Sequence, residues 1–265
     1  MRIKVTFQHE SGILVPWDYQ YAVQQWVYKI LAAADKDLAT HLHNIGYVYE
    51  GKSFKLFNFG PWTCFPFKPN SNKGMWFNNP NSSLNVSFLL PEQLSTFVSG
   101  LFKDQSHTFF FKDKISIPVS IVQIELLPEP IFVDGSVTYE LMTGCRISVH
   151  EVGHAHAQYI GPEHEDYHYF FIQNLVNKHR SSLLYKGEGN KEYTIGMQVF
   201  DPVKSQKVNV PKDGKVVEMI GYKYPFELNA PADIHRTLYY AGAGEECSVG
   251  MGWVEKVIIT NNKIS

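Results

Sequence analysis

Cysteine is scarce in this chain of 265 residues, and its three cysteines lie far apart, at Cys64, Cys145 and Cys247. A set that is odd in number and widely spaced predicts neither a disulfide framework nor a zinc site built from pairs of thiolates. Free, scattered cysteines fit a reducing compartment. We therefore expect a cytoplasmic protein.

Long apolar runs are also missing. No stretch approaches the roughly 18 apolar residues that predict a membrane-spanning helix. Residues 1–7 alternate between polar and apolar side chains, as a half-buried strand does, and contain no apolar stretch of signal-peptide length. The sequence therefore predicts no membrane partner and no secretion.

An excess of positive charge is lacking as well, because 24 Lys and Arg stand against 26 Asp and Glu, a net charge of −2. This balance argues against a nucleic-acid binder that is basic over its whole surface, since contacts with phosphate dominate such binding. Net charge does not describe distribution, however, and residues 203–215 contain four lysines and one acid. Lys204 and Lys207 are therefore candidates for contact with a phosphate backbone, and a solvated basic hairpin is the alternative.

The sequence is rich in apolar residues, which make up 44% of the chain, with 14% aromatic. That content supports a sizeable core and excludes global disorder. The spacing of apolar residues predicts strand, helix, strand, strand, helix, strand in the first half, and the same order again in the second. The expected strands are 2–8, 54–59, 84–90, 108–111, 115–124, 146–152, 193–200, 216–226 and 253–260. The expected helices are 18–34, 35–43, 92–102, 162–184 and 231–240.

Two βαββαβ units in tandem predict an α+β fold of two ferredoxin-like, RRM-like domains. Residues 127–130 include two prolines, which interrupt regular structure. We therefore predict an N-terminal domain at 1–126, a linker at 127–144 and a C-terminal domain at 145–265.

A glycine-rich segment lies between the last predicted helix and the last predicted strand, with glycines at Gly242, Gly244, Gly250 and Gly252. Glycine adopts positive φ and lets backbone N–H groups approach a phosphate closely. No Gly-Lys-Ser/Thr follows, which excludes a Walker loop, and the order helix-loop-strand excludes a dinucleotide-binding fingerprint. A phosphate-binding loop and an ordinary turn both remain open interpretations.

In this segment, G-x-G followed by G-M-G resembles the C-terminal glycine-rich signature of the CRISPR repeat-processing endoribonucleases, members of the RAMP superfamily. Three N-terminal pieces resemble the same family. They are Pro16 and Tyr-Gln-Tyr leading into Val-Tyr at 27–28, Leu-His at 42–43, and Phe-Lys-Leu-Phe-Asn-Phe at 54–59. All four pieces occur in the family's order between about residue 1 and residue 258, so the sequence is identified as a member of this family.

The resemblance implies a metal-independent endoribonuclease that cleaves CRISPR precursor RNA within its repeats, leaving a 2′,3′-cyclic phosphate and a 5′-hydroxyl. Such a reaction needs a base, an acid and positive charge near the phosphate. His43 matches the family's catalytic histidine, Tyr28 a tyrosine that orients reacting groups, and Lys55 a lysine that stabilises negative charge. Lys52 is close enough in sequence to compete for the role of Lys55. The resemblance implies no metal and no cofactor.

CRISPR repeat RNA is the implied partner, bound in part by the four glycines and by Lys204 and Lys207. A CRISPR effector complex and a second copy of the chain are further candidate partners. Taken singly, Tyr28, His43 and Lys55 each have an ordinary structural explanation, as a packed aromatic, a histidine at a helix C-terminus and an exposed lysine. A relative that binds repeat RNA without cutting it is therefore the alternative.

His150, Glu151 and His154 form an H-E-x-x-H motif, the signature of zinc metallopeptidases. The motif needs a helix, which places residues i and i+4 on one face. Residues 145–149 alternate like a strand, and Gly153 weakens a helix. On a strand the two histidines would lie about 13 Å apart, too far for one zinc. We therefore expect no metal site and keep a peptidase only as an alternative.

Overall fold

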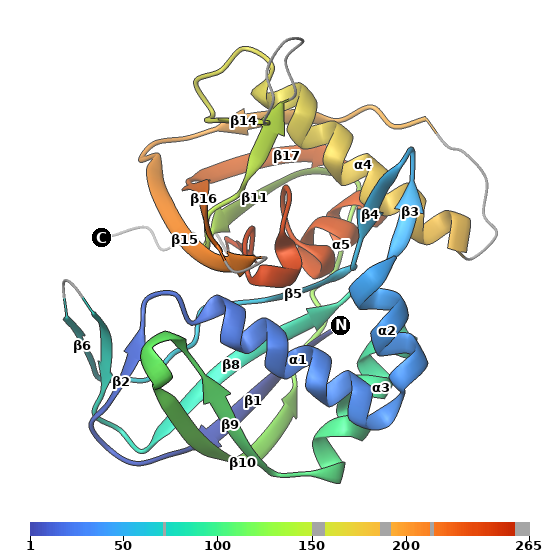
Figure 1. The fold of residues 1–265 in the computed structure, drawn as a ribbon. Helices are drawn as coiled ribbons and strands as arrows, with labels where there is room; N and C mark the ends of the chain where they lie inside the picture. Colours follow the sequence, from blue (N-terminus) through green and yellow to red (C-terminus); the bar gives the residue numbers. More distant parts are fainter. Residues whose placement is uncertain (71–72, 150–156, 186–191, 213–214, 258–265) are drawn as a thin grey trace, which may run out of the picture.

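The computed structural model describes residues 1–70, 73–149, 157–185, 192–212 and 215–257. The N-terminal half is built on a five-stranded antiparallel sheet of order β5-β8-β1-β10-β9 (Figure 1). Its elements are β1 (Arg2–Gln8), α1 (Gln20–Ala34), α2 (Lys36–Asn44), β5 (Phe57–Phe59), β8 (Asn81–Phe88), α3 (Pro91–Lys103), β9 (Ser106–Phe110), η1 (Lys112–Lys114) and β10 (Ser116–Leu126). In chain order β1, α1, β5, β8, α3 and β10 form the βαββαβ unit of a ferredoxin-like fold.

The two periodicities of the sequence explain this half. Ile3, Val5 and Phe7 alternate along β1 and are buried. The buried residues of α1 recur at helical spacing, and Trp26 contacts the ring of Phe7 edge to face at 5.3 Å. Strand and helix therefore meet in one apolar core, as the patterns predict.

The C-terminal half repeats the arrangement in a four-stranded antiparallel sheet of order β14-β17-β11-β18. Its elements are β11 (Gly135–Leu141), α4 (Tyr167–Tyr185), β14 (Gly196–Val199), β17 (Pro225–Ala230), α5 (Ala232–Ala241), η2 (Cys247–Val249) and β18 (Val254–Lys256). If the strands of each βαββαβ unit are numbered in chain order, both sheets have the order second, third, first, fourth. The fold is therefore two tandem ferredoxin-like units, and this prediction is confirmed.

The strands of the second unit differ in place from those predicted. The expected linker at 127–144 contains β11, because the prolines end at Pro130 and the buried residues Val137, Tyr139 and Leu141 then alternate. The expected first strand, 146–152, contributes instead β12 (Ile147–Val149), which pairs with β13 (Gln158–Ile160) outside the main sheet. The division of the chain at 126 and 145 remains a prediction.

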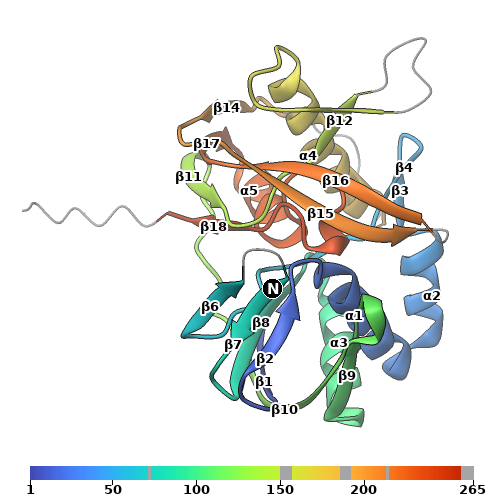
Figure 2. The same cartoon turned by 60° about the vertical axis from the view of Figure 1, so that its left-hand side comes forward.

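Within the described residues, four small strand pairs and sheets accompany the two main sheets. They are β2 (Ile13–Pro16) with β7 (Gly74–Phe77) and β6 (Phe67–Asn70), β3 (Tyr47–Tyr49) with β4 (Lys52–Phe54), β12 with β13, and β15 (Lys204–Lys212) with β16 (Lys215–Lys223). The hairpin β15–β16 crosses the front of the molecule in Figure 2 and contacts α1. The strand predicted at 216–226 thus belongs mainly to this hairpin, and β17 takes its place in the sheet. None of the helices in the described ranges is long and apolar enough to cross a membrane.

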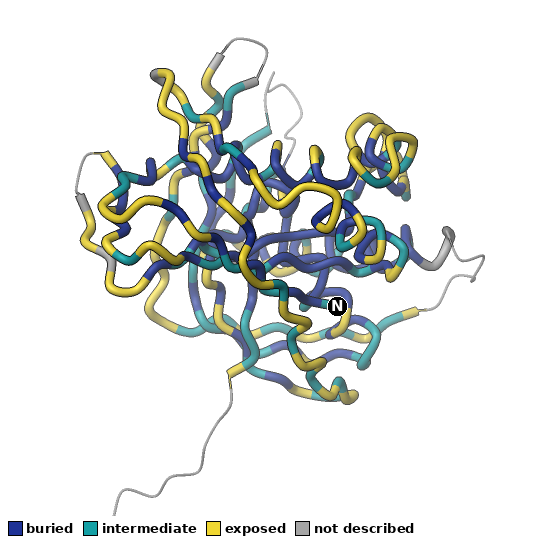
Figure 3. The backbone as a smooth tube through the Cα atoms, turned by 90° about the horizontal axis from the view of Figure 1, so that it is seen from below, coloured by how far each residue is buried: buried dark blue, intermediate teal, exposed yellow. Residues whose placement is uncertain are grey.

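Arg2 links the two halves of the chain. Buried residues run through the interior of the molecule, and exposed residues lie mostly around its edge (Figure 3). Arg2, from β1, is 3% exposed and donates to the Glu255 carboxylate at 2.9 Å. Its guanidinium lies 3.4 Å from the ring centroid of Tyr239 and 3.9 Å from that of Trp253. A buried arginine with a carboxylate partner and two aromatic faces ties the first strand of the chain to the C-terminal half.

Candidate active site at the junction of the two halves

The structure brings together the three residues that the sequence singles out for catalysis. Tyr28 lies on α1, His43 on the last turn of α2, and Lys55 in the two-residue break between β4 and β5. The ring centroids of Tyr28 and His43 are 5.2 Å apart, edge to face. The Lys55 Nζ atom donates to the carbonyl oxygen of His43 at 3.1 Å. Three separate elements thus converge on one place.

Helix α2 positions His43. The Asp35 carboxylate accepts from the backbone N–H of Leu38 at 2.9 Å and caps the helix. Ala39 and Leu42 are buried and hold the helix on the core. His43 comes next on the helix and is exposed, with its Nδ1 atom 2.9 Å from Asn44 Oδ1. The imidazole is therefore accessible to a substrate.

Lys55 lies in the break between β4 and β5 and not in the continuous strand predicted at 54–59. Leu56, with φ 57°, lies in the same break and departs from the extended backbone of a strand. The Gln93 side chain, on α3, donates to the Lys55 carbonyl oxygen at 3.0 Å. Partial burial lowers the pKa of Lys55, and the negative charge of Glu246 partly offsets that effect.

Tyr28 is half-buried and packs edge to face on Phe57, with ring centroids 5.6 Å apart. Burial raises the pKa of the Tyr28 hydroxyl, and the nearby charge of Glu246 raises it further. The hydroxyl therefore stays protonated at neutral pH and can donate a hydrogen bond. It is not suited to act as a base.

Lys52 differs from Lys55 in what it contacts. It is exposed on β4, opposite Tyr49 in the hairpin. Both lysines line the same cavity. Only Lys55 has a hydrogen bond to His43 among the described contacts, which favours Lys55 for the catalytic role.

That cavity has a volume of about 800 Å³ and lies between the two halves. Residues of both halves line it: on one side Asn44 and 52–57, and on the other Ser148, Val149, Phe170, Asn174, Lys178, Ala241 and 244–248. A cleft of this size between two units is a usual place for a binding site.

The glycine-rich segment forms the second wall of the cavity, but its glycines are buried. All four have positive φ. The N–H groups of Gly242, Gly250 and Gly252 donate to the carbonyl oxygens of Leu238, Cys247 and Gly144 at 2.9–3.0 Å. These three N–H groups therefore have partners inside the protein and are not free to receive phosphate.

The glycines also allow close packing at the junction of the halves. A Cβ atom at Gly250 would lie 2.3 Å from the Phe59 ring, and one at Gly242 would lie 2.2 Å from the Asn58 side chain. Both neighbours belong to β5, the edge strand that follows the break at Lys55. The segment thus joins the second unit to the site through contacts that only glycine permits.

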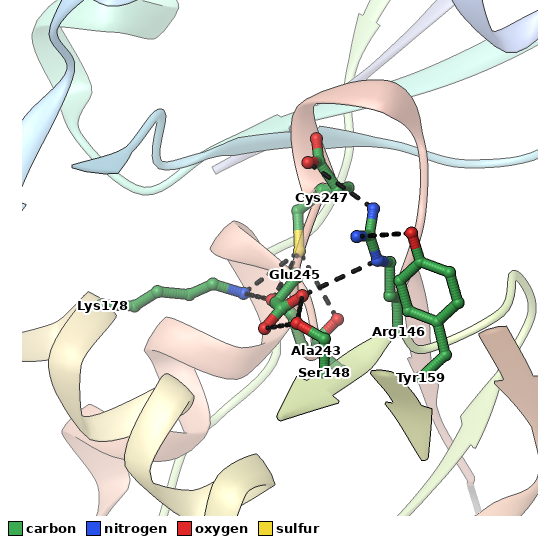
Figure 4. Close-up of polar contacts among 9 residues, drawn as sticks. Arg146, Ser148, Tyr159, Lys178, Ala243, Glu245 and Cys247 are labelled. Atoms are coloured by element: carbon green, nitrogen blue, oxygen red, sulfur yellow. Dashed lines mark hydrogen bonds and ion pairs between the residues drawn. The ribbon is translucent and has the colours of Figure 1, made fainter. Parts of the chain in front are cut away.

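Sequence reasoning missed Lys178, which holds this segment from α4 (Figure 4). Lys178 is 4% exposed, and its Nζ donates to the carbonyl oxygens of Gly242 at 2.7 Å and Gly244 at 2.5 Å. It also lies 3.1 Å from Cys247 Sγ. Asn174 and Lys178 are four residues apart and so lie on one face of α4. The sequence does not indicate that this face is buried.

Arg146 pairs with Glu245, as Figure 4 shows, and also with Glu246. It lies 3.7 Å from both the Glu245 and the Glu246 carboxylates and packs over the Tyr159 ring. Ser148 donates to the Glu245 carboxylate at 2.8 Å. Glu246, with φ 57°, adds to the rise in the pKa of Tyr28 and partly offsets the burial that lowers the pKa of Lys55.

The two lysines proposed for contact with a phosphate backbone lie elsewhere. Lys204 and Lys207 are exposed on β15, and neither lines the cavity. Lys207 forms an ion pair with Glu218 at 3.1 Å, which reduces the positive charge it offers. Their role in RNA binding remains a prediction.

The H-E-x-x-H residues His150, Glu151 and His154 lie outside the described residues. Within the described ranges, no group of three or more His, Cys, Asp or Glu side chains is placed to hold a metal ion.

Replacing Gly244 by alanine is expected to destabilise the protein. A Cβ atom there would lie 2.4 Å from the Arg146 carbonyl oxygen, and φ is +69°. The matched control is Gly12→Ala, because Gly12 has φ +75° with nothing within 4 Å of the new atom. Positive φ costs each variant about 1–2 kcal/mol, and overpacking adds about 1–3 kcal/mol for Gly244→Ala alone.

Urea unfolding measures both variants. Equal losses of the free energy of unfolding would contradict the packing role of Gly244.

The fold and the site together define a class: a protein of two tandem ferredoxin-like units with a glycine-rich segment buried at their junction beside a histidine, a tyrosine and a lysine. Residues 127–256 match the family described as CRISPR associated protein Cas6, C-terminal. The match covers the C-terminal half of the chain, and it confirms the resemblance to the CRISPR repeat-processing proteins.

Solved structures agree over nearly the whole chain. The product of a Cas6-related gene from Pyrococcus furiosus is 17% identical with a TM-score of 0.78, covering 98% of this chain and 99% of that one. An RAMP protein binding different RNA substrates is 16% identical with a TM-score of 0.78, covering 97% and 100%.

A Cas6 product complex, of a protein from Thermus thermophilus, is 12% identical with a TM-score of 0.65, covering 97% and 99%. At these identities the likeness establishes the fold. No curated protein matches the chain in sequence.

Proposed function

We propose that this protein is a metal-independent endoribonuclease that cleaves CRISPR precursor RNA within its repeats. The observation that carries the proposal is the convergence of Tyr28, His43 and Lys55 beside a cavity between two ferredoxin-like units. The match to the Cas6 C-terminal family supports CRISPR repeat RNA as the substrate. The likeness to an RAMP protein that binds RNA and to a Cas6 product complex supports the same class of activity.

In this reaction the ribose 2′-oxygen attacks the adjacent phosphorus and the bond from phosphorus to the 5′-oxygen breaks. His43 is the principal acid/base: its exposed imidazole takes the 2′-hydroxyl proton, and the imidazolium that forms returns a proton to the leaving 5′-oxygen. Tyr28 donates a hydrogen bond from its protonated hydroxyl and helps to orient the reacting groups. The Lys55 ammonium stabilises the negative charge that develops on the phosphate.

CRISPR repeat RNA is the proposed partner. The RNA phosphate that is cleaved would bind beside the cavity at the junction of the two halves. Association with a CRISPR effector complex and pairing with a second copy remain predictions.

Cleavage of repeat RNA is expected to survive an excess of EDTA, because side chains supply the acid, the base and the positive charge. The assay follows a labelled RNA of the CRISPR repeat that occurs with this protein's gene, in EDTA and with added Mg²⁺ or Zn²⁺.

Complete loss of cleavage in EDTA, restored by either metal, would contradict the mechanism. Binding without any cleavage would favour the relative that holds the repeat and does not cut it. Proteolysis that disappears in His150→Ala would favour the peptidase alternative.

A further inference from the structure

The cavity contains a buried side-chain amide without a partner. Asn174 lines the cavity and is 6% exposed, and its Oδ1 atom has no hydrogen-bond partner among the described residues. Leaving a buried polar group unpaired is unfavourable, because it has lost its hydrogen bonds to water. A group left unpaired in the wall of a cavity is therefore suited to pair with a molecule that enters it.

The neighbours of Asn174 on α4 indicate the chemical class of the molecule that binds there. Phe170, Asn174 and Lys178 are spaced by four residues, which places them on one face of the helix, and all three line the cavity. The Lys178 ammonium already donates to the carbonyl oxygens of Gly242 and Gly244. An aromatic ring and an amide remain, the combination with which proteins stack an unpaired nucleobase and bond to its edge.

The position of the cavity agrees with this ligand. Its opposite wall includes Lys55, which bonds to the His43 carbonyl, and Asn44, whose Oδ1 lies 2.9 Å from His43 Nδ1. A base bound beside Asn174 would therefore belong to a nucleotide close to the proposed point of cleavage. The volume of about 800 Å³ lies within the range usual for pockets that hold organic ligands.

We propose that this cavity binds one nucleobase of the RNA, turned out of its strand, and that Asn174 reads its edge. Adenine is the favoured base, because an asparagine amide can both accept from its amino group and donate to a ring nitrogen. The inference rests on the proposed function for RNA as the ligand, and it assigns a specificity-determining residue that takes no part in the chemistry.

The test measures binding alone, by fluorescence anisotropy with short single-stranded oligomers of A, C or U. A 2′-fluoro group replaces the attacking hydroxyl, so cleavage cannot affect the result. The wild-type protein is expected to bind the A oligomer most tightly. Asn174→Ala is expected to weaken that binding by about 5- to 100-fold, the usual worth of a paired base edge, to the level of the U oligomer.

Asn177→Ala is the matched control, because Asn177 lies on the same helix, is 4% exposed, and also has an unpartnered Oδ1 atom, yet does not line the cavity. It is expected to keep the preference for A. Asn174→Asp keeps the shape of the side chain and removes its N–H donors, so it repeats the test if the alanine variant does not fold by circular dichroism.

Equal weakening of all three oligomers, or the same effect from both alanine variants, would overturn the base pocket and mean that cavity water satisfies Asn174. A wild-type preference for C or U would overturn adenine as the base. Binding without any base preference contradicts the pocket and leaves the proposed cleavage intact, whereas failure to bind any oligomer contradicts both.

Discussion

Replacing His43 by alanine is expected to slow single-turnover cleavage of repeat RNA by about 10²–10⁴-fold, the usual contribution of a positioned acid/base. The imidazole is exposed and lies against the Tyr28 ring, and its ring nitrogens can both accept and donate a proton. Because the side chain is not part of the core, the fold and the affinity for RNA are expected to change little. Quench-flow or manual time courses with enzyme in excess measure the rate, and anisotropy measures the affinity.

His41→Ala is the matched control, since His41 lies on the same helix and its ring contacts Tyr47 instead of Tyr28. It is expected to cleave at nearly the wild-type rate. Equal rates for His43→Ala and the wild type would remove His43 from the mechanism. A loss of RNA affinity as large as the loss of rate would mean that His43 serves recognition.

Lys55→Ala is expected to reduce the rate of cleavage strongly, and more than it weakens RNA binding. A charge that is needed mainly in the transition state affects the rate constant more than the ground-state affinity. Lys55 bonds to the His43 carbonyl, whereas Lys52 lines the cavity from an exposed position on β4. Lys52→Ala is therefore expected to behave as a surface substitution, and the reverse ranking would show that Lys52 is the catalytic lysine.

The pH dependence adds a second test of Lys55. Burial lowers its pKa below the usual value for lysine, so its ammonium loses its proton at a lower pH than an exposed lysine does. Cleavage is expected to fall at alkaline pH as pH rises through that pKa. Lys55→Arg keeps the charge and is expected to move the fall to higher pH. If the loss of cleavage at high pH occurs at the same pH in Lys55→Arg as in the wild type, a group other than Lys55 causes it.

Much of the fold could be predicted from local patterns. The alternation of Ile3, Val5 and Phe7 and the helical spacing around Trp26 follow directly from which side chains must be buried. Strand β11 is not predicted, because it begins at Gly135, inside the stretch that the prolines at 128 and 130 indicate as a linker. The break at Leu56 is not predicted, because a positive φ at a leucine is uncommon and no local pattern signals it.

The sequence likewise predicts some residues of the candidate site and not others. Tyr28, His43 and Lys55 were found because their order along the chain resembles a family, and the structure shows that they are neighbours. Lys178 and Asn174 were missed, since polar residues on a long helix are usually solvated and only the packing of the two halves buries them. Contact of the four glycines with RNA remains a prediction, and the N–H groups of Gly242, Gly250 and Gly252 donate to carbonyl oxygens inside the protein.

The termini of the cleaved RNA test the central claim most directly. The protein is incubated in EDTA with its cognate repeat RNA, and the products are identified by mass spectrometry. Attack by the 2′-oxygen predicts a 2′,3′-cyclic phosphate on the upstream fragment and a 5′-hydroxyl on the downstream fragment. A 3′-hydroxyl with a 5′-phosphate, the result expected when a metal activates a water molecule for attack on the phosphate, would contradict the account.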